Sequence, residues 1–305
     1  VVATIVAAAL CCCCCCCGAC AWRLRKYQQQ QPLGFKSKIS TVTGKYYPEI
    51  EALRFNFYPA VDGQRSDTLL VSFAGAALQV GGFPKQEFRK SLAAFNCDQV
   101  YCMDPQQSFY LDAPRQCHGK RWEGYTALET RLRDECRHYR SVVFIGCSMG
   151  GSAVVLFSHL ATVALAFNPL VDLDVEKARP RFFFWLRNKF IPAKVRSDFK
   201  RNIHNNIGLN RRRGCRVVVH YSALREDMRH IDTLPTDKDT GCELVFHKEC
   251  PHHNTAQFLK RRGQLAGVIG GAVRWASDHP DMHHGVSPAH INAVLDSKES
   301  SEAKP

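Results

Sequence analysis

The fold of this chain is decided by residues 146–151, which read GCSMGG. They follow the apolar run Val142–Ile145 and precede a segment typical of a helix, Ser152–Leu160. A G-x-S-x-G pattern between a strand and a helix predicts a sharp turn, in which the glycines let both elements pack closely. Such a turn holds the serine hydroxyl at the end of the strand, beside the positive end of the helix dipole. The pattern therefore predicts that Ser148 is a nucleophile.

Strands and helices alternate along the rest of the chain. Apolar runs predict strands at Thr68–Phe73, Gln99–Met103, Val142–Ile145, Val163–Phe167, Arg216–Tyr221 and Leu244–His247. Helical periodicity is found at Pro84–Phe95, Trp122–Tyr139, Ser152–Leu160 and Phe258–Trp275. One or two early antiparallel strands are expected within Tyr46–Tyr58. This order predicts an α/β fold with a mostly parallel sheet and helices on both faces, so that the loops after the strands meet along one edge.

A histidine must activate the serine, because a hydroxyl is a weak nucleophile at neutral pH. Two adjacent candidates, His252 and His253, follow the last predicted strand and precede the last helix. We prefer His253 because it leads directly into the helix, and we keep His252 as the alternative. His247 lies within a strand and is a poorer candidate.

The histidine in turn needs a carboxylate that fixes its tautomer. Asp227, in the segment after the strand that ends at Tyr221, comes between the serine and the histidine in the chain. This order suits a nucleophile elbow. The alternatives are Glu226, Asp232, and Asp172 or Asp174 after the preceding strand.

An oxyanion requires two hydrogen-bond donors near the nucleophile. We expect one from the backbone N–H of Met149, which directly follows Ser148. The second is expected from the loop after the first buried strand, around Gly75. This chemistry needs no metal and no organic cofactor, and no C-x-x-C pair occurs after residue 22 that would suggest zinc.

Across about residues 45–275, the chain resembles the α/β-hydrolase superfamily. The resemblance rests on the turn at 146–151, on the order of strands and helices, and on an acid and a histidine in the right sequence. It implies hydrolysis of an ester, thioester or amide through an acyl-enzyme. The chain departs from the usual pattern at two points: Ala74-Gly75 stands where His-Gly is common, and Pro251 precedes the histidine pair where glycine is usual.

The first 22 residues contain no charged side chain and include seven consecutive cysteines, Cys11–Cys17. A helix of this length spans about 30 Å, the thickness of a bilayer core. We expect a membrane anchor, with the main domain on the cytoplasmic side because basic residues follow at once. Three other interpretations remain open: a signal peptide cleaved near Ala19–Ala21, acylation of the cysteines, and a low-complexity run without a role.

The domain organisation expected from these patterns has four parts. They are an apolar Cys-rich segment at 1–22, a basic and polar linker at 23–44, a hydrolase-like domain at 45–277 and a disordered tail at 278–305. The resemblance also suggests a lid insertion at 175–213, where the aromatic run Pro180–Leu186 lies among basic residues. Such a lid would hold an acyl chain or touch a membrane surface, and the alternative is a helix packed on its aromatic face.

The net charge of +13 suits an anionic surface, but no nucleic-acid-binding motif accompanies it, and no nucleic-acid partner is expected. Three functions therefore stay open. The first is a serine hydrolase acting on a small-molecule or lipid-like acyl substrate, with membrane association. The second is an acyltransferase on the same machinery, and the third is a non-catalytic module that binds anionic surfaces.

Overall fold

The computed structural model describes residues 55–61, 66–75, 86–104, 109–111, 124–174, 193–235 and 242–284. All of them belong to the second of two units in the chain, Thr41–Pro305. The predicted anchor at 1–22, the linker at 23–44 and most of the predicted tail lie outside these ranges and stay predictions. In the described part of the chain, no helix combines the length and the hydropathy that a bilayer crossing requires.

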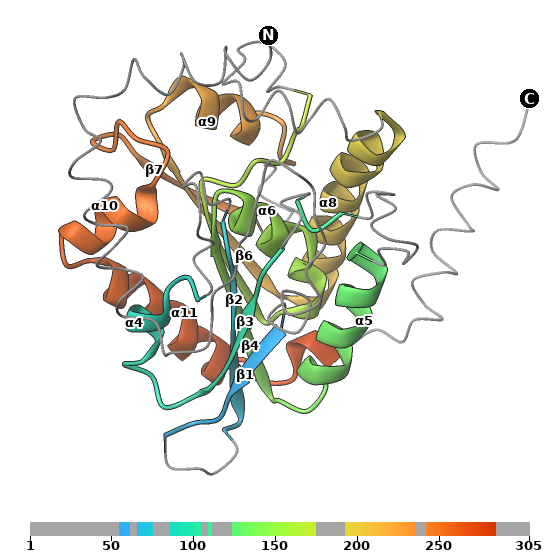
Figure 1. The fold of residues 1–305 in the computed structure, drawn as a ribbon, viewed down its shortest axis with the longest axis vertical. Coiled ribbons are helices and arrows are strands. Elements are labelled where there is room, and N and C mark those ends of the chain that lie inside the picture. The colour runs from blue at the N-terminus through green and yellow to red at the C-terminus, as the bar shows by residue number, and fades with distance from the viewer. Residues whose placement is uncertain are drawn as a thin grey trace, which may run out of the picture. The chain divides into compact units, whose positions relative to one another are not determined.

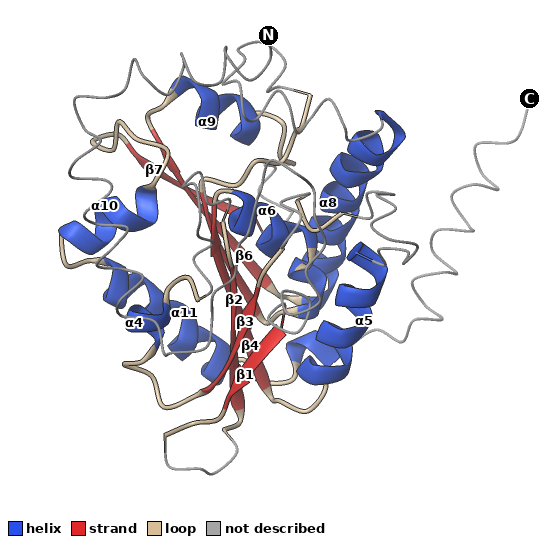
Figure 2. Ribbon diagram, in the orientation of Figure 1, coloured by secondary structure: helices blue, strands red, loops and turns tan. Residues whose placement is uncertain are grey.

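Within the described residues, a seven-stranded sheet forms the centre of the unit (Figures 1 and 2). Its spatial order is β1-β3-β2-β4-β5-β6-β7, and every neighbouring pair is parallel except β1 with β3. The strands are β1 (Phe55–Tyr58), β2 (Thr68–Phe73), β3 (Asp98–Cys102), β4 (Ser141–Cys147), β5 (Val163–Phe167), β6 (Arg216–Ser222) and β7 (Cys242–His247). The predicted mostly parallel α/β fold is therefore confirmed, and β1 is the described antiparallel strand of the Tyr46–Tyr58 region.

The central strands are buried on both faces, which is why they read as continuous apolar runs. Successive side chains alternate between two separate cores. In β4, Val142 and Phe144 join one core, whereas Val143 and Ile145 join the other. Each core is closed by its own layer of helices, so the sheet is the middle layer of three (Figure 2).

The first core is covered by α5 (Gly124–Cys136), α6 (Met149–Leu156) and α8 (Ala193–Arg213). Every residue of α6 is buried, because this short helix packs directly beneath the centre of the sheet. In α8, Phe199, Ile203 and Ile207 recur at helical spacing and are fully buried. The helix α8 is thus the crossover from β5 to β6, and it covers the second half of the predicted lid range. A lid at 175–192 lies outside the described residues.

The second core is covered by α4 (Arg89–Leu92), α10 (Thr255–Arg261) and α11 (Leu265–Asp278). The predicted single helix Phe258–Trp275 is two helices, because the chain breaks at Gly263 in a left-handed conformation with φ of 71°. Within the predicted helix Pro84–Phe95, the described portion is helical only over the four residues of α4. Phe88, the residue before α4, has φ of 64°. This left-handed conformation does not fit an α-helix, so α4 cannot extend past Phe88 toward the N-terminus.

The start of the predicted disordered tail is ordered in part. After α11 the chain forms the short helix η4 (Met282–His284). The ring of His283 is buried, and its Nδ1 lies 3.1 Å from the hydroxyl oxygen of Thr162. This contact fastens the segment to the end of the sheet where β5 begins, so the tail prediction is wrong for residues 278–284.

The glycines of the turn at 146–151 can be tested by a pair of Gly→Ala changes. A Cβ at Gly150 would fall on the carbonyl oxygen of Phe73, whereas a Cβ at the exposed helical Gly267 meets open space. We expect Gly150→Ala to lower the free energy of unfolding by about 2 kcal/mol. Gly267→Ala should raise it by about 1 kcal/mol, because alanine is the better helix former. Urea denaturation of both variants measures the difference, and equal stability would contradict the close approach.

Candidate active site

Ser148 sits at the sharp turn between β4 and α6. Its backbone has φ of 56° and ψ of −122°, a conformation that costs free energy in a residue with a side chain. The turn is held by a hydrogen bond from its N–H to the carbonyl oxygen of Phe167, at 2.8 Å. A Cβ on Gly146 would overlap the carbonyl group of Gly150 across the turn. The sequence pattern is thus required by backbone geometry, which leaves the Ser148 hydroxyl at the C-terminal edge of the sheet.

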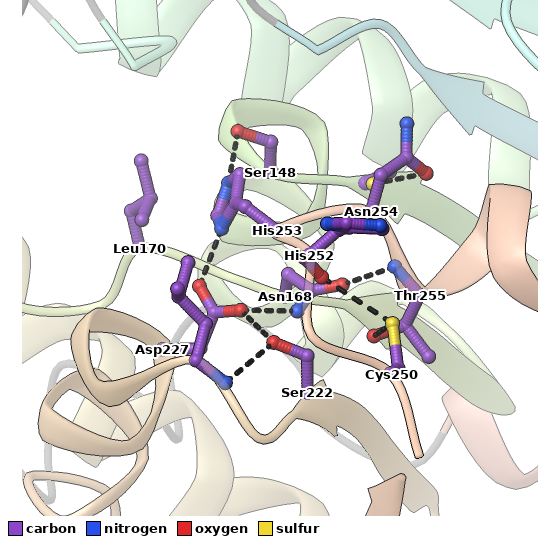
Figure 3. Close-up of polar contacts among 12 residues, drawn as sticks. Ser148, Asn168, Leu170, Ser222, Asp227, Cys250, His252, His253, Asn254 and Thr255 are labelled. Atoms are coloured by element: carbon purple, nitrogen blue, oxygen red, sulfur yellow. Dashed lines mark hydrogen bonds and ion pairs between the residues drawn. The ribbon is translucent and has the colours of Figure 1, made fainter. Parts of the chain in front are cut away.

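The ring of His253 lies between Ser148 and Asp227 (Figure 3). Its Nε2 is 2.8 Å from the Ser148 Oγ, and its Nδ1 is hydrogen-bonded to the Asp227 Oδ1. With the proton on Nδ1, the ring donates to the carboxylate and Nε2 accepts from the hydroxyl. The loop that carries His253 ends at Asn254, whose side chain caps α10 by accepting from the Gln257 N–H at 2.9 Å.

Asp227 is a buried carboxylate with three side-chain partners. Besides His253, its Oδ2 accepts from the Asn168 Nδ2 at 2.7 Å and from the Ser222 hydroxyl. Desolvation by itself raises the pKa of Asp227, but the hydrogen bond and charge of His253 and the hydrogen bonds of Ser222 and Asn168 outweigh it. The pKa therefore lies below the ordinary value, and the group is ionised at neutral pH.

The sequence patterns did not point to Asn168 or Ser222 as site residues, although each directly follows a predicted strand. Asn168 comes after β5 and adopts φ of 47°, in the left-handed region that asparagine tolerates. Its amide joins two parts of the site, because its Oδ1 accepts from the Thr255 N–H at 2.8 Å while its Nδ2 holds Asp227. A polar residue directly after a buried strand, at the sheet edge that carries the nucleophile, was the available signal.

The structure does not bring the alternative residues to Ser148. His252 is exposed, and among the described residues its ring makes no hydrogen bond (Figure 3). Two of the alternative acids pair elsewhere: Asp172 with Lys200 at 2.7 Å, and Asp174 with Arg196 at 2.8 Å. The other two belong to α9 (Arg225–Ile231), where Glu226 lies in the first turn and Asp232 is the C-terminal cap.

The two expected oxyanion donors differ in their surroundings. Met149 is the first residue of α6, and within the described part of the chain no group accepts from its N–H. The N–H of Gly75, by contrast, donates to the Glu87 Oε2 at 2.5 Å. One donor is therefore open and the other is occupied by a carboxyl group that the sequence did not indicate.

A serine, a histidine and a buried aspartate in one hydrogen-bonded row can move a proton from the hydroxyl to the ring. The buried charge of Asp227 stabilises the imidazolium that results. Over the described ranges, no group of three or more histidine, cysteine, aspartate or glutamate residues is arranged to hold a metal ion.

Comparison with known proteins gives likeness in structure but not in sequence. Neither a protein-family model nor a curated protein sequence matches the chain. A chain of the Gap123 glycosylation-associated complex from Streptococcus agalactiae superposes with a TM-score of 0.51 and 13% identity. The match covers 70% of this chain and 43% of that one.

Two further solved structures are similar to the chain at a TM-score of 0.47. The esterase Est2 of Thermogutta terrifontis with butyrate bound shares 17% identity, over 72% of this chain and 88% of that one. The capsule O-acetyltransferase of Neisseria meningitidis serogroup A shares 9% identity, over 71% and 90%.

The depressed pKa of Asp227 predicts a pH-dependent contribution to stability. The folded-state pKa is below the unfolded one, so the contribution is present above the unfolded pKa and is lost as pH falls through the folded one. We expect wild-type protein to be more stable than Asp227→Asn at pH 7, with the difference shrinking below about pH 4. Urea denaturation at pH 7 and pH 3 measures it, with the exposed Asp134→Asn as control. A difference that stays constant between the two pH values would contradict the assignment.

Proposed function

We propose that this chain, which has the α/β-hydrolase fold, is a serine hydrolase that cleaves an ester, thioester or amide bond through an acyl-enzyme. The observation that carries the proposal is the position of the His253 ring, with one nitrogen 2.8 Å from the Ser148 hydroxyl and the other bonded to Asp227. Ser148 follows β4, Asp227 lies in the first turn of α9 after β6, and His253 follows β7, which is the chain order that a nucleophile elbow requires.

In this mechanism the Ser148 Oγ attacks the carbonyl carbon of the substrate, and the His253 Nε2 takes the hydroxyl proton. The carbonyl oxygen becomes an oxyanion, which the Met149 N–H is placed to stabilise at the positive end of α6. When the intermediate collapses, His253 returns the proton to the leaving alcohol, thiol or amine. Water then attacks the acyl-serine, with His253 as the base again, and releases the acid.

The substrate proposed is a small-molecule or lipid-like acyl compound. An acyltransferase would use the same acyl-enzyme and replace water by an alcohol, so product analysis with added alcohol acceptors distinguishes the two reactions. The sequence also predicts membrane attachment through residues 1–22, and we keep this as part of the proposal. It can be tested by comparing how the protein binds to vesicles that contain anionic lipid when residues 1–22 are present and when they are removed.

The nucleophile can be tested with a fluorophosphonate probe. We expect the wild-type protein to be labelled and Ser148→Ala to remain unlabelled, because the probe forms its covalent bond with an activated serine. Ser277→Ala removes an exposed serine hydroxyl on α11 and is the matched control, which should label as the wild type does. The proposal would be wrong if the folded wild-type protein is never labelled, or if Ser148→Ala is still labelled.

The two adjacent histidines provide a second test. His253→Ala should reduce the labelling rate by about 10³-fold or more, because the serine loses its base. His252→Ala should change the rate by less than about threefold, because its exposed ring touches neither Ser148 nor Asp227. The rate constants come from labelling time courses on variants whose thermal unfolding matches the wild type. Equal losses in both variants would count against the assignment of the base.

A further inference from the structure

Glu87 occupies a backbone donor that the proposed reaction needs. The Gly75 N–H, expected to face the oxyanion, donates instead to the Glu87 Oε2 at 2.5 Å. The main chain of Glu87 is fixed as well, because its carbonyl oxygen accepts from the Ser72 hydroxyl of β2 at 2.6 Å. The next residue, Phe88, has φ of 64°. Such a backbone conformation costs free energy and persists only where the surrounding structure enforces it, so Glu87 is held in place from both sides.

The carboxyl group of Glu87 lies beside the turn that carries the nucleophile. A Cβ built on Gly75 would be 2.9 Å from the carbonyl oxygen of Cys147 and 3.2 Å from the Glu87 Oε2. Both oxygens therefore crowd the same face of Gly75. The carboxyl group therefore lies beside the backbone of Cys147, the residue that directly precedes Ser148.

Nothing in the described surroundings neutralises a charge on Glu87. No lysine or arginine of the described ranges pairs with its carboxyl group, whose hydrogen-bond partner in these ranges is the Gly75 N–H. Two titratable groups feel its charge, the Cys147 thiol of the turn and the Tyr110 hydroxyl, which donates to the Ala74 carbonyl oxygen. Burial raises the pKa of both, so they are neutral. Desolvation raises the pKa of Glu87 to about 7, against the opposing hydrogen bond from Gly75.

We propose that Glu87 is a positioning residue that controls the oxyanion hole: its carboxylate caps the Gly75 N–H in the resting site, and acyl transfer requires this group to be neutral or displaced. The inference rests on the proposed serine hydrolase function. An ionised Glu87 withholds one donor and places a negative charge near the oxyanion, which raises the energy of the transition state. A neutral carboxyl group is a weaker acceptor, releases the donor more readily and adds no repulsion.

The ionisation of Glu87 then limits the activity at high pH. As pH rises through the pKa of Glu87, about 7, the carboxyl group ionises and the labelling rate falls. The wild-type protein should therefore show a descending limb at high pH that belongs to Glu87.

The test compares fluorophosphonate labelling rates of the wild type, Glu87→Gln and Glu87→Ala between pH 5 and pH 9. We expect both variants to lose the descending limb, so that at pH 9 they label at least about tenfold faster than the wild type. Glu243→Gln, which removes an exposed carboxylate at the far end of β7, is the matched control and should keep the descending limb.

Each outcome bears on one hypothesis. Variants with the same descending limb as the wild type, or folded variants that label more slowly at every pH, overturn the role of Glu87 and leave the serine hydrolase intact. A wild-type protein that is never labelled at Ser148 overturns the function and this inference together. Glu87→Gln keeps an acceptor for the Gly75 N–H, so it serves if Glu87→Ala fails to fold.

Protein stability provides a readout that is independent of activity. Because the folded-state pKa of Glu87 is raised, its neutral form favours the folded state, and stability is lost as pH rises from the unfolded pKa to about 7. Glu87→Gln should therefore gain stability relative to the wild type between pH 4.5 and pH 8, measured by urea denaturation. An unchanged difference across this range would show that the carboxyl group is solvated, which contradicts the proposal.

Discussion

The site depends on one steric constraint, the close approach of three backbone segments around the turn after β4. Gly146 packs on the carbonyl group of Gly150, and Gly150 packs on the end of β2 at Phe73. In a third contact, a Cβ built on Gly151 would lie 2.8 Å from the carbonyl oxygen of Phe167 on β5. Only residues without a Cβ fit these contacts, and the packing forces Ser148 into its left-handed conformation. The strained serine is therefore a consequence of how the sheet and α6 meet.

Around this turn, the structure keeps one negative charge buried and fully partnered. Asp227 accepts hydrogen bonds from Ser222 at the end of β6, from Asn168 directly after β5 and from His253 after β7. A buried carboxylate with fewer partners would take up a proton and lose its hold on the histidine. Glu87 shows the contrast, because its carboxyl group accepts from the Gly75 N–H and desolvation raises its pKa to about 7, although the residue is only partly buried. The number of partners thus separates an ionised carboxyl group from a protonatable one.

Much of this arrangement could be predicted from the sequence, and the reasons are local. The strands β2, β4 and β5 are buried on both faces, so their composition alone identified them. The preference for His253 over His252 and for Asp227 over Glu226 agrees with which side chains meet in the structure. Predictions failed where a single backbone angle decides, as at Gly263, which divides the last helix, and at Phe88, before the shortened α4. Residues 278–284 were misjudged because their order depends on contacts with distant parts of the chain, such as that of His283 with Thr162.

Sequence patterns are enough to predict the alternation of strands and helices, the glycine-flanked serine and the order of serine, acid and histidine, because periodicity and backbone sterics are properties of neighbouring residues. Which atoms meet depends on the folded arrangement. The amide of Asn168 bridges Asp227 and Thr255, and the carboxyl group of Glu87 reaches the N–H of Gly75. These contacts arise because parallel strands bring their C-terminal ends to one edge, where loops far apart in the chain share a single desolvated space.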